Sequence, residues 1–99
     1  MASRIAFTAA AQRDLIAIAE FSSEKFGEAQ AAKYQKVVAD AFRLLEQFPQ
    51  IGVDVSDVKP DARRHVHASH AIYYRIRDDD VLVLRILGRG QDPTSEFAE

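Results

Sequence analysis

The chain has 99 residues, of which 47% are hydrophobic and 28% are charged, a composition typical of one soluble globular domain over residues 1–99. It contains no cysteine, which excludes disulfides and thiolate chemistry, and no apolar run approaches the roughly 20 residues that a membrane-spanning helix needs. Because the first eight residues also lack a signal-peptide pattern, we expect a cytoplasmic protein that makes no membrane contact.

The first half of the chain predicts one short strand followed by two helices. Residues 3–7 (SRIAF) alternate as an edge strand does, and Thr8 offers a hydroxyl cap for a helix that opens at Ala9. Gly27 is a natural left-handed stop, and a second helix starts near Glu28 and ends before Pro49. Residues that share a helical face recur at spacings of three and four: Ala11, Leu15, Ile18, Ser22 and Phe26, then Ala31, Tyr34, Val38, Ala41, Leu45 and Phe48. With one glycine between them, the helices are expected to form an antiparallel hairpin.

The second half predicts three strands, over residues 64–68, 71–77 and 81–87, and residues 3–7 extend the same sheet as a fourth strand. Residues 53–62 alternate weakly around Pro60 and are expected to form a loop. On the middle strand Ile72, Tyr74 and Ile76 face one way and Tyr73, Arg75 and Arg77 the other, which predicts one covered and one uncovered face. The expected fold class is α+β, with a two-helix antiparallel hairpin packed on a small, mainly antiparallel sheet in the order β-α-α-β-β-β.

The net charge of −2 hides an asymmetry, because residues 63–91 carry six arginines and no lysine against three aspartates. Arg75, Arg77 and Arg85 fall on adjacent strands and predict a cationic patch on the uncovered face. Such a patch suits bidentate contact with phosphate or with an acidic peptide. The alternative is that these arginines pair with the aspartates of the turn at residues 78–80. The acidic total argues against a surface built to grip nucleic acid by phosphate neutralisation alone.

His65, His67 and His70 are the strongest candidates for metal ligands. His65 and His67 are two residues apart on a strand and therefore point to the same face. No carboxylate or cysteine is spaced to complete the site, so we favour polar-face histidines and expect neither a metal nor another cofactor. His67 or His70 beside an arginine has the chemistry of a general base for RNA cleavage, although nothing in the spacing indicates convergence. The Gly88–Gly90 segment is not expected to bind phosphate, because no helix is predicted beyond it.

Several short motifs follow one another along the chain. They are A-x-x-D-L-x-x-I-A-x-F at residues 11–21, F-G at 26–27, Q-A-x-x-Y at 30–34, L-x-x-F-P-x-x-G at 45–52, Y-R-I at 74–76 and V-L-x-I-L…D-P over 83–93. Taken in order, they resemble the ParE branch of the ParE/RelE toxin superfamily from bacterial toxin–antitoxin pairs. The resemblance covers nearly the whole chain.

The resemblance implies a β-α-α-β-β-β toxin that is encoded beside a smaller antitoxin and neutralised by it. The expected antitoxin is ParD-like, a ribbon-helix-helix dimer through which the toxin contacts operator DNA only indirectly. ParE-type toxins poison DNA gyrase, whereas RelE-type toxins are basic endoribonucleases that cut messenger RNA on the ribosome. The closing segment GRGQDPTSEFAE is acidic and offers Arg89 but no tyrosine or histidine, so a gyrase inhibitor is favoured over an enzyme. An endoribonuclease and a non-toxic antitoxin-binding module remain the alternatives.

The resemblance also implies two functional surfaces. The antitoxin tail is expected to lie in a groove along the helices and the sheet edge, in contact with Leu15, Ile18, Phe21, Arg75 and Arg85. The toxicity surface is expected near the end of the sheet, at Arg63, Arg64, Arg89, Gln91 and Asp92. No residue is assigned a catalytic or metal-binding role.

Overall fold

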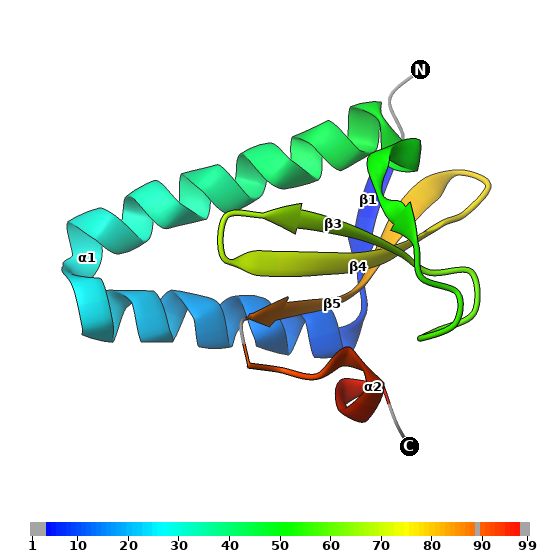
Figure 1. Ribbon diagram of the computed structural model, residues 1–99. Helices are drawn as coiled ribbons and strands as arrows, with labels where there is room; N and C mark the ends of the chain where they lie inside the picture. The colour runs from blue at the N-terminus through cyan, green and yellow to red at the C-terminus, as the bar shows by residue number, and fades with distance from the viewer. Residues whose placement is uncertain (1–3, 89, 98–99) are drawn as a thin grey trace.

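A computed structural model of the chain describes residues 4–88 and 90–97 and has the expected α+β architecture. A bent helical hairpin packs on a five-stranded sheet (Figure 1). In chain order the elements are β1 (Arg4–Phe7), α1 (Ala9–Gln47), the 3-10 turn η1 (Pro49–Ile51), β2 (Val53–Asp54), β3 (Arg63–His67), β4 (His70–Ile76), β5 (Asp80–Gly88) and α2 (Pro93–Glu96). None of the helices in the described part of the chain is long and apolar enough to cross a membrane.

Helix α1 begins and bends where the sequence predicts. The Thr8 hydroxyl accepts a hydrogen bond from Ala11 N at 3.0 Å and donates one to Leu84 O at 2.8 Å, so the N-cap also fastens the helix to β5. Gly27 interrupts the helix with φ 82° and ψ 166°, a conformation that glycine adopts far more readily than other residues. The two halves of α1 therefore fold back on each other, which confirms the predicted hairpin (Figure 1).

The strand order across the sheet is β1-β5-β4-β3-β2. β1 runs parallel to β5, and the remaining pairs are antiparallel, as the expected mainly antiparallel sheet requires. The predicted loop over residues 53–62 is wrong at its start, because Val53 and Asp54 pair with Arg64 and Arg63. The expectation of no helix beyond Gly90 is also wrong, because Asp92 caps the single turn of α2 by accepting from Thr94 N at 3.0 Å.

Apolar side chains fill both faces of the sheet. The core between sheet and α1 is built from Ala11, Ala41, Leu45, Ile72, Tyr74, Val81, Val83 and Ile86. On the opposite face, Val55 and Ala62 of the 55–62 segment pack with Tyr73, Leu84 and Leu87, and Phe97 joins them from beyond α2. The prediction of an uncovered face is therefore wrong: Tyr73 alternates away from the helices as expected, but its side chain is only 3% exposed.

Tyr74 connects the end of α1 to the sheet. Its hydroxyl donates to Pro49 O at 2.6 Å and accepts from Gly52 N at 2.9 Å, and its ring is fully buried. Burial raises the pKa of Tyr74, so the hydroxyl keeps the proton that it donates. Gly52 lies so close to this ring that an added Cβ would stand 2.8 Å from Cε1 and 2.9 Å from Cζ.

We predict that Gly52→Ala lowers the free energy of unfolding by about 1–3 kcal/mol, because a buried ring cannot move aside for the new methyl group. The matched control is Gly88→Ala, whose Cβ would meet its nearest neighbour, the His70 ring, at an ordinary 3.5 Å. Urea denaturation of both variants measures the difference. Equal midpoints for the two variants would show that the Tyr74 contact does not constrain residue 52.

Candidate functional site

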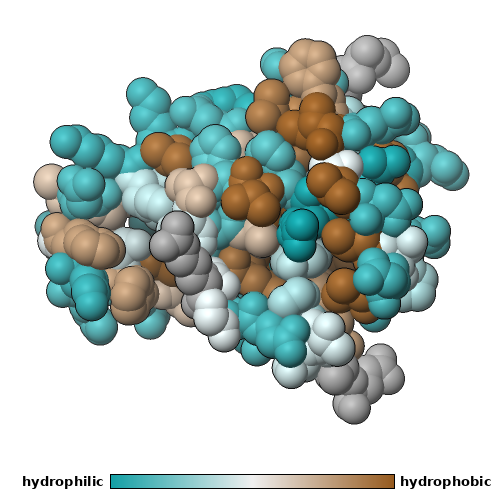
Figure 2. Space-filling view, viewed as in Figure 1, coloured by the Kyte–Doolittle hydropathy of each residue, from teal (hydrophilic) through white to brown (hydrophobic). Residues whose placement is uncertain are grey.

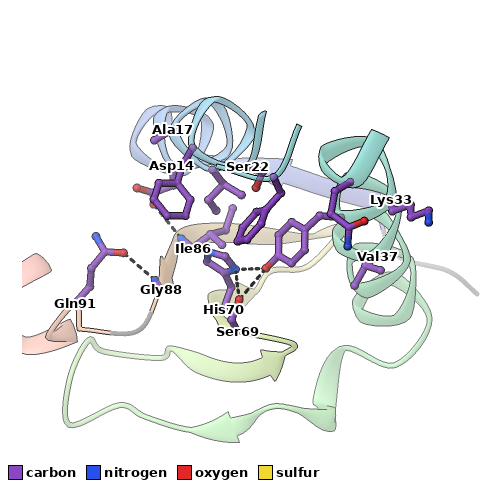
Figure 3. Close-up of a pocket in the computed structure, with 15 residues that line it drawn as sticks. Asp14, Ala17, Ser22, Lys33, Val37, Ser69, His70, Ile86, Gly88 and Gln91 are labelled. Carbon is purple, nitrogen blue, oxygen red and sulfur yellow. Dashed lines mark hydrogen bonds between the residues drawn. The ribbon is translucent and has the colours of Figure 1, made fainter. Parts of the chain in front are cut away.

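A cavity of about 600 Å³ opens between the two halves of α1 and the adjoining end of the sheet (Figure 3). We call it the groove. It is lined by Asp14, Ala17, Ile18, Phe21, Ser22, Phe26, Gln30, Lys33, Tyr34, Val37, Ser69, His70, Ile86, Gly88 and Gln91. The groove surface is thus mainly apolar, with polar side chains interspersed along it, which is a composition that suits a binding site.

Two phenylalanines make the turn of α1 an exposed apolar surface. Phe21 and Phe26 are each 58% exposed, and their rings meet edge to face with centroids 6.5 Å apart. The ammonium group of Lys25 lies 5.9 Å from the centre of the Phe21 ring. Figure 2 shows apolar side chains among hydrophilic neighbours at this turn, on the left of the molecule. Phe26 was predicted on the packed face of its helix, and that prediction is wrong because the turn projects beyond the sheet.

A polar cluster of three side chains lies at the sheet side of the groove. The Tyr34 hydroxyl hydrogen-bonds to His70 Nδ1, and Ser69 Oγ lies 3.4 Å from both groups (Figure 3). Burial lowers the pKa of His70 because a charged imidazole loses hydration there, so the ring is neutral at pH 7. The cluster joins the second half of α1 to the β3–β4 turn.

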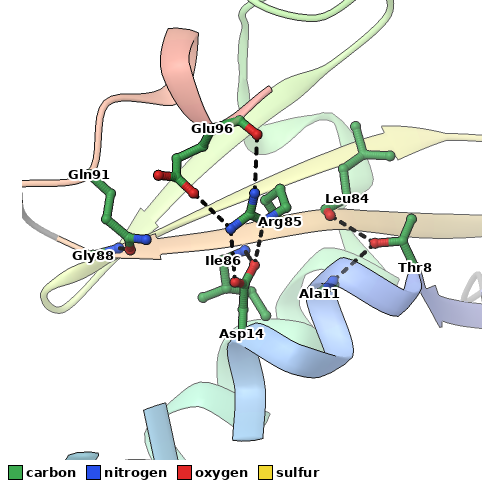
Figure 4. Close-up of polar contacts among 9 residues, drawn as sticks. All are labelled: Thr8, Ala11, Asp14, Leu84, Arg85, Ile86, Gly88, Gln91 and Glu96. Carbon is green, nitrogen blue, oxygen red and sulfur yellow. Dashed lines mark hydrogen bonds and ion pairs between the residues drawn. The ribbon is translucent and has the colours of Figure 1, made fainter. Parts of the chain in front are cut away.

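A second polar cluster forms the opposite wall (Figure 4). Asp14 Oδ2 accepts from Arg85 Nε at 2.7 Å and from Ile86 N at 2.9 Å, and Asp14 Oδ1 accepts from Arg85 Nη2 at 3.0 Å. Arg85 also donates to the side chain and the carbonyl of Glu96 in α2, at 3.0 and 3.2 Å. Hydrogen bonds to Asp14, and then to Glu96, raise the pKa of Arg85.

The residues predicted to bind an antitoxin do not form one surface. Ile18 and Phe21 line the groove, and Leu15 is half-buried against the core on the same half of α1. Arg75 lies on the opposite face of the sheet and donates to Pro60 O at 3.2 Å. Arg85 is paired with Asp14 and Glu96, and Arg77 is paired with Asp80. The predicted cationic patch of Arg75, Arg77 and Arg85 on an uncovered face is therefore wrong, and the alternative of pairing with the 78–80 turn is confirmed for Arg77.

The residues predicted to form the toxicity surface lie at two ends of the sheet. Arg63 and Arg64 begin β3, and Arg63 donates to Gly52 O at 2.8 Å. Gln91 and Asp92 follow the far end of β5, where Gln91 Oε1 accepts from Gly88 N at 2.7 Å. Both of these side chains hold turns in place, since Asp92 caps α2. Arg89 lies outside the described residues.

The three histidines have different surroundings. His65 and His67 share one side of β3 with ring centroids 5.9 Å apart, and burial, then the neighbouring His67, lower the pKa of His65. His70 is bound to Tyr34 instead. Within residues 4–88 and 90–97, no three His, Cys, Asp or Glu side chains are arranged to hold a metal ion.

Two groups of the site were missed from the sequence. Asp14 stands three residues after Ala11 and four before Ile18, within the stripe that packs on the core, and an acidic residue there signals a buried partner. The Tyr34–His70 contact left no comparable signal, because it spans 36 residues and joins a helix to a turn.

Three comparisons place this geometry among known proteins. The family model described as the ParE toxin of the type II toxin-antitoxin system parDE matches residues 5–93. Toxin ParE1 of Mycobacterium tuberculosis is 28% identical over 93 residues, which are 93% of this chain and 95% of that protein. Toxin ParE3 of Caulobacter vibrioides is 33% identical over 70 residues, which are 71% of this chain and 66% of that protein.

Solved structures share the fold. A chain described as the chromosomal ParDE TA system from P. aeruginosa superposes with a TM-score of 0.75 at 20% identity, covering 87% of this chain and 95% of that one. The conserved hypothetical protein HP0894 of Helicobacter pylori superposes with a TM-score of 0.54 at 14% identity, covering 90% and 97%. The hairpin on a sheet is therefore an architecture found in proteins with distant sequences.

We predict that Asp14→Ala lowers the free energy of unfolding by about 3 kcal/mol, because it leaves Arg85 Nε and Ile86 N without an acceptor in a partly buried site. The control is Asp40→Ala, which breaks the exposed Asp40–Arg43 pair and should cost less than about 0.5 kcal/mol. Chemical denaturation provides the comparison. Similar losses in the two variants would mean that burial adds nothing to the Asp14 cluster.

Proposed function

The chain belongs to the ParE toxin family of type II toxin–antitoxin systems, and from this premise we propose that it inhibits DNA gyrase in the cytoplasm. We propose further that a ParD-like antitoxin of the ribbon-helix-helix class neutralises it by placing a tail segment in the groove. In this scheme the toxin touches operator DNA only through the antitoxin. This proposal assigns no residue a catalytic role, and the protein acts by binding its target.

The single observation that supports a tail in the groove is its exposed apolar lining. Phe21 and Phe26 leave more than half of their surface in water, although monomeric proteins rarely leave neighbouring aromatic side chains so exposed without a use. An amphipathic segment laid along a helical hairpin buries such side chains by ordinary groove recognition. Ile18 would form the floor of that contact and Phe21 its rim, whereas Leu15 would support the floor from the core side.

The two arginines assigned to this contact would act differently from each other. Arg85 donates hydrogen bonds to Asp14 and Glu96, so its contribution is to hold the groove wall in place. Arg75 is half-buried on the other face and keeps a guanidinium that forms no ion pair with a described residue. A tail that reached Arg75 would have to continue around the edge of the sheet.

One observation favours the alternative function of an endoribonuclease. The Tyr34–His70 pair in the groove has the chemistry of a general acid and base. Cleavage through a 2′-hydroxyl also needs cations around the scissile phosphate, and Lys33 is the one cationic side chain among the described residues that line the groove. The balance favours gyrase inhibition.

We expect induced expression of this chain alone to arrest bacterial growth with a loss of plasmid supercoiling and with intact messenger RNA. Purified chain should inhibit supercoiling by purified gyrase in proportion to its concentration. Growth arrest with fragmented messenger RNA would identify the endoribonuclease instead. Normal growth with folded protein present would leave only the antitoxin-binding module.

We predict that Phe21→Ser weakens binding of the antitoxin encoded beside the toxin by about tenfold or more, because a buried aromatic anchor contributes about 1.4 kcal/mol or more. Ile16→Ser is the matched control, since Ile16 is equally exposed at 59% but does not line the groove. Titration calorimetry measures both affinities, and co-expression should show that only the Phe21 variant escapes neutralisation. Equal losses in the two variants would show that Phe21 has no special role and would contradict a tail seated in the groove.

A further inference from the structure

Two acceptors of the groove are already occupied, and some of its donors are unused. Asp14 supplies the one carboxylate among the described lining residues, and both of its oxygens are occupied by Arg85 and Ile86 N. Gln91 Oε1 is likewise occupied by Gly88 N, so its amide nitrogen is left to donate. Lys33, at the rim, forms no ion pair with a described residue. A partner that satisfies the Gln91 amide nitrogen and the Lys33 ammonium group must bring acceptors.

His70, which also lines the groove, supplies a further donor. Its Nδ1 is taken by the Tyr34 hydroxyl, and with Tyr34 donating, the neutral ring carries its proton on Nε2. Nε2 has no hydrogen-bond partner among the described residues. It lies beside Gly88, where an added Cβ would stand 3.5 Å away, so the absence of a side chain at residue 88 leaves this nitrogen open to the groove.

We propose that the groove recognises a segment carrying a carboxylate next to an aromatic or large aliphatic side chain, and that His70 Nε2 donates to that carboxylate. The apolar side chain would pack between Phe21 and Val37, and Lys33 and the Gln91 amide would add donors at the two ends. This inference rests on the proposed function, because the segment is assigned to the antitoxin. It replaces Arg75 and Arg85 with His70 as the group that contacts the acidic part of the tail.

The charges around His70 determine the pH dependence of this contact. The groups that face it are Tyr34 and Lys33 from the second half of α1, Asp14 from the first half, and His67 opposite it on β3. In the free protein, burial holds the pKa of His70 below its ordinary value. A bound carboxylate favours the charged imidazolium and raises that pKa, so the complex takes up a proton. Binding therefore strengthens as pH falls toward the pKa of His70 in the complex.

The test uses the purified full chain and two probes of nearly equal shape, 4-phenylbutyrate and its neutral amide, 4-phenylbutanamide. Nitrogen-15 NMR of the histidine rings reports binding and tautomer together. We expect millimolar dissociation constants, with the acid bound about fivefold tighter than the amide at pH 6.5 and low salt. The acid should bind about threefold tighter at pH 6.5 than at pH 8, whereas the amide should not change in this direction.

His70→Phe keeps a ring of similar size and should remove most of the preference for the acid, whereas His67→Phe should preserve the fivefold preference. Gly88→Ala places a methyl group 3.5 Å from Nε2 without removing any side chain of the cluster and should also reduce the preference, which keeps the test decisive if the His70 variant fails to fold. Equal affinities in the unaltered chain, an undiminished preference in Gly88→Ala, or no binding by folded protein would overturn the proposal. None of these outcomes depends on gyrase or on the antitoxin, so they are distinguishable from failure of the proposed function.

Discussion

The ion pair between Asp14 and Arg85 joins the first half of α1 to β5, both of which contribute residues to the groove, and links them to α2. Asp14 belongs to the first half of α1, Arg85 to β5, and the same guanidinium reaches Glu96 in α2. The pair is mostly shielded from water, with 13% and 17% of the two side chains exposed. At such a site the bidentate geometry and the additional bond from Ile86 N offset the loss of hydration. The groove wall thus depends on one carboxylate.

A β-bulge makes this ion pair possible. Tyr73 pairs with Arg85 and Tyr74 pairs with Val83, which leaves Leu84 as an extra residue in β5. Strict alternation from Val81 and Val83 would send residue 85 into the core beneath α1. With the bulge, Ile86 occupies that core position and Arg85 is displaced toward Asp14 and Glu96. Alternation along the sequence carries no sign of the extra residue, so it did not predict the contact of Arg85 with Asp14. The arginine patch was mispredicted because Arg77 and Arg85 are paired with acidic side chains and Arg75 donates to Pro60 O.

The elements that were predicted correctly have local causes. The Thr8 cap, the Gly27 bend and the alternation of Ile72, Tyr73 and Tyr74 each depend on residues within a few positions of one another. The features that were missed depend on partners far apart in the chain. Asp14 and Arg85 are separated by 71 residues, and the cover of the second sheet face comes from a segment with no regular structure and from Phe97. Sequence spacing therefore predicted the elements, and the family resemblance implied a groove along the helices, but neither indicated which donors inside it are free.

The geometry of the hairpin explains why the groove is open at all. The first half of α1, residues 9–26, is about 27 Å long, and the helix turns only at Gly27, beyond the β3–β4 turn (Figure 1). The alanines at positions 11 and 41, near the base of the hairpin, are fully buried on the sheet, whereas Phe21 and Phe26 project past it. Within the described chain, no strand extends under this part of the hairpin to cover it. The apolar stripe of the helix extends further than the sheet, so this part of the stripe is available to pack against another molecule. The donors of His70 and Lys33 determine what kind of molecule can bind there.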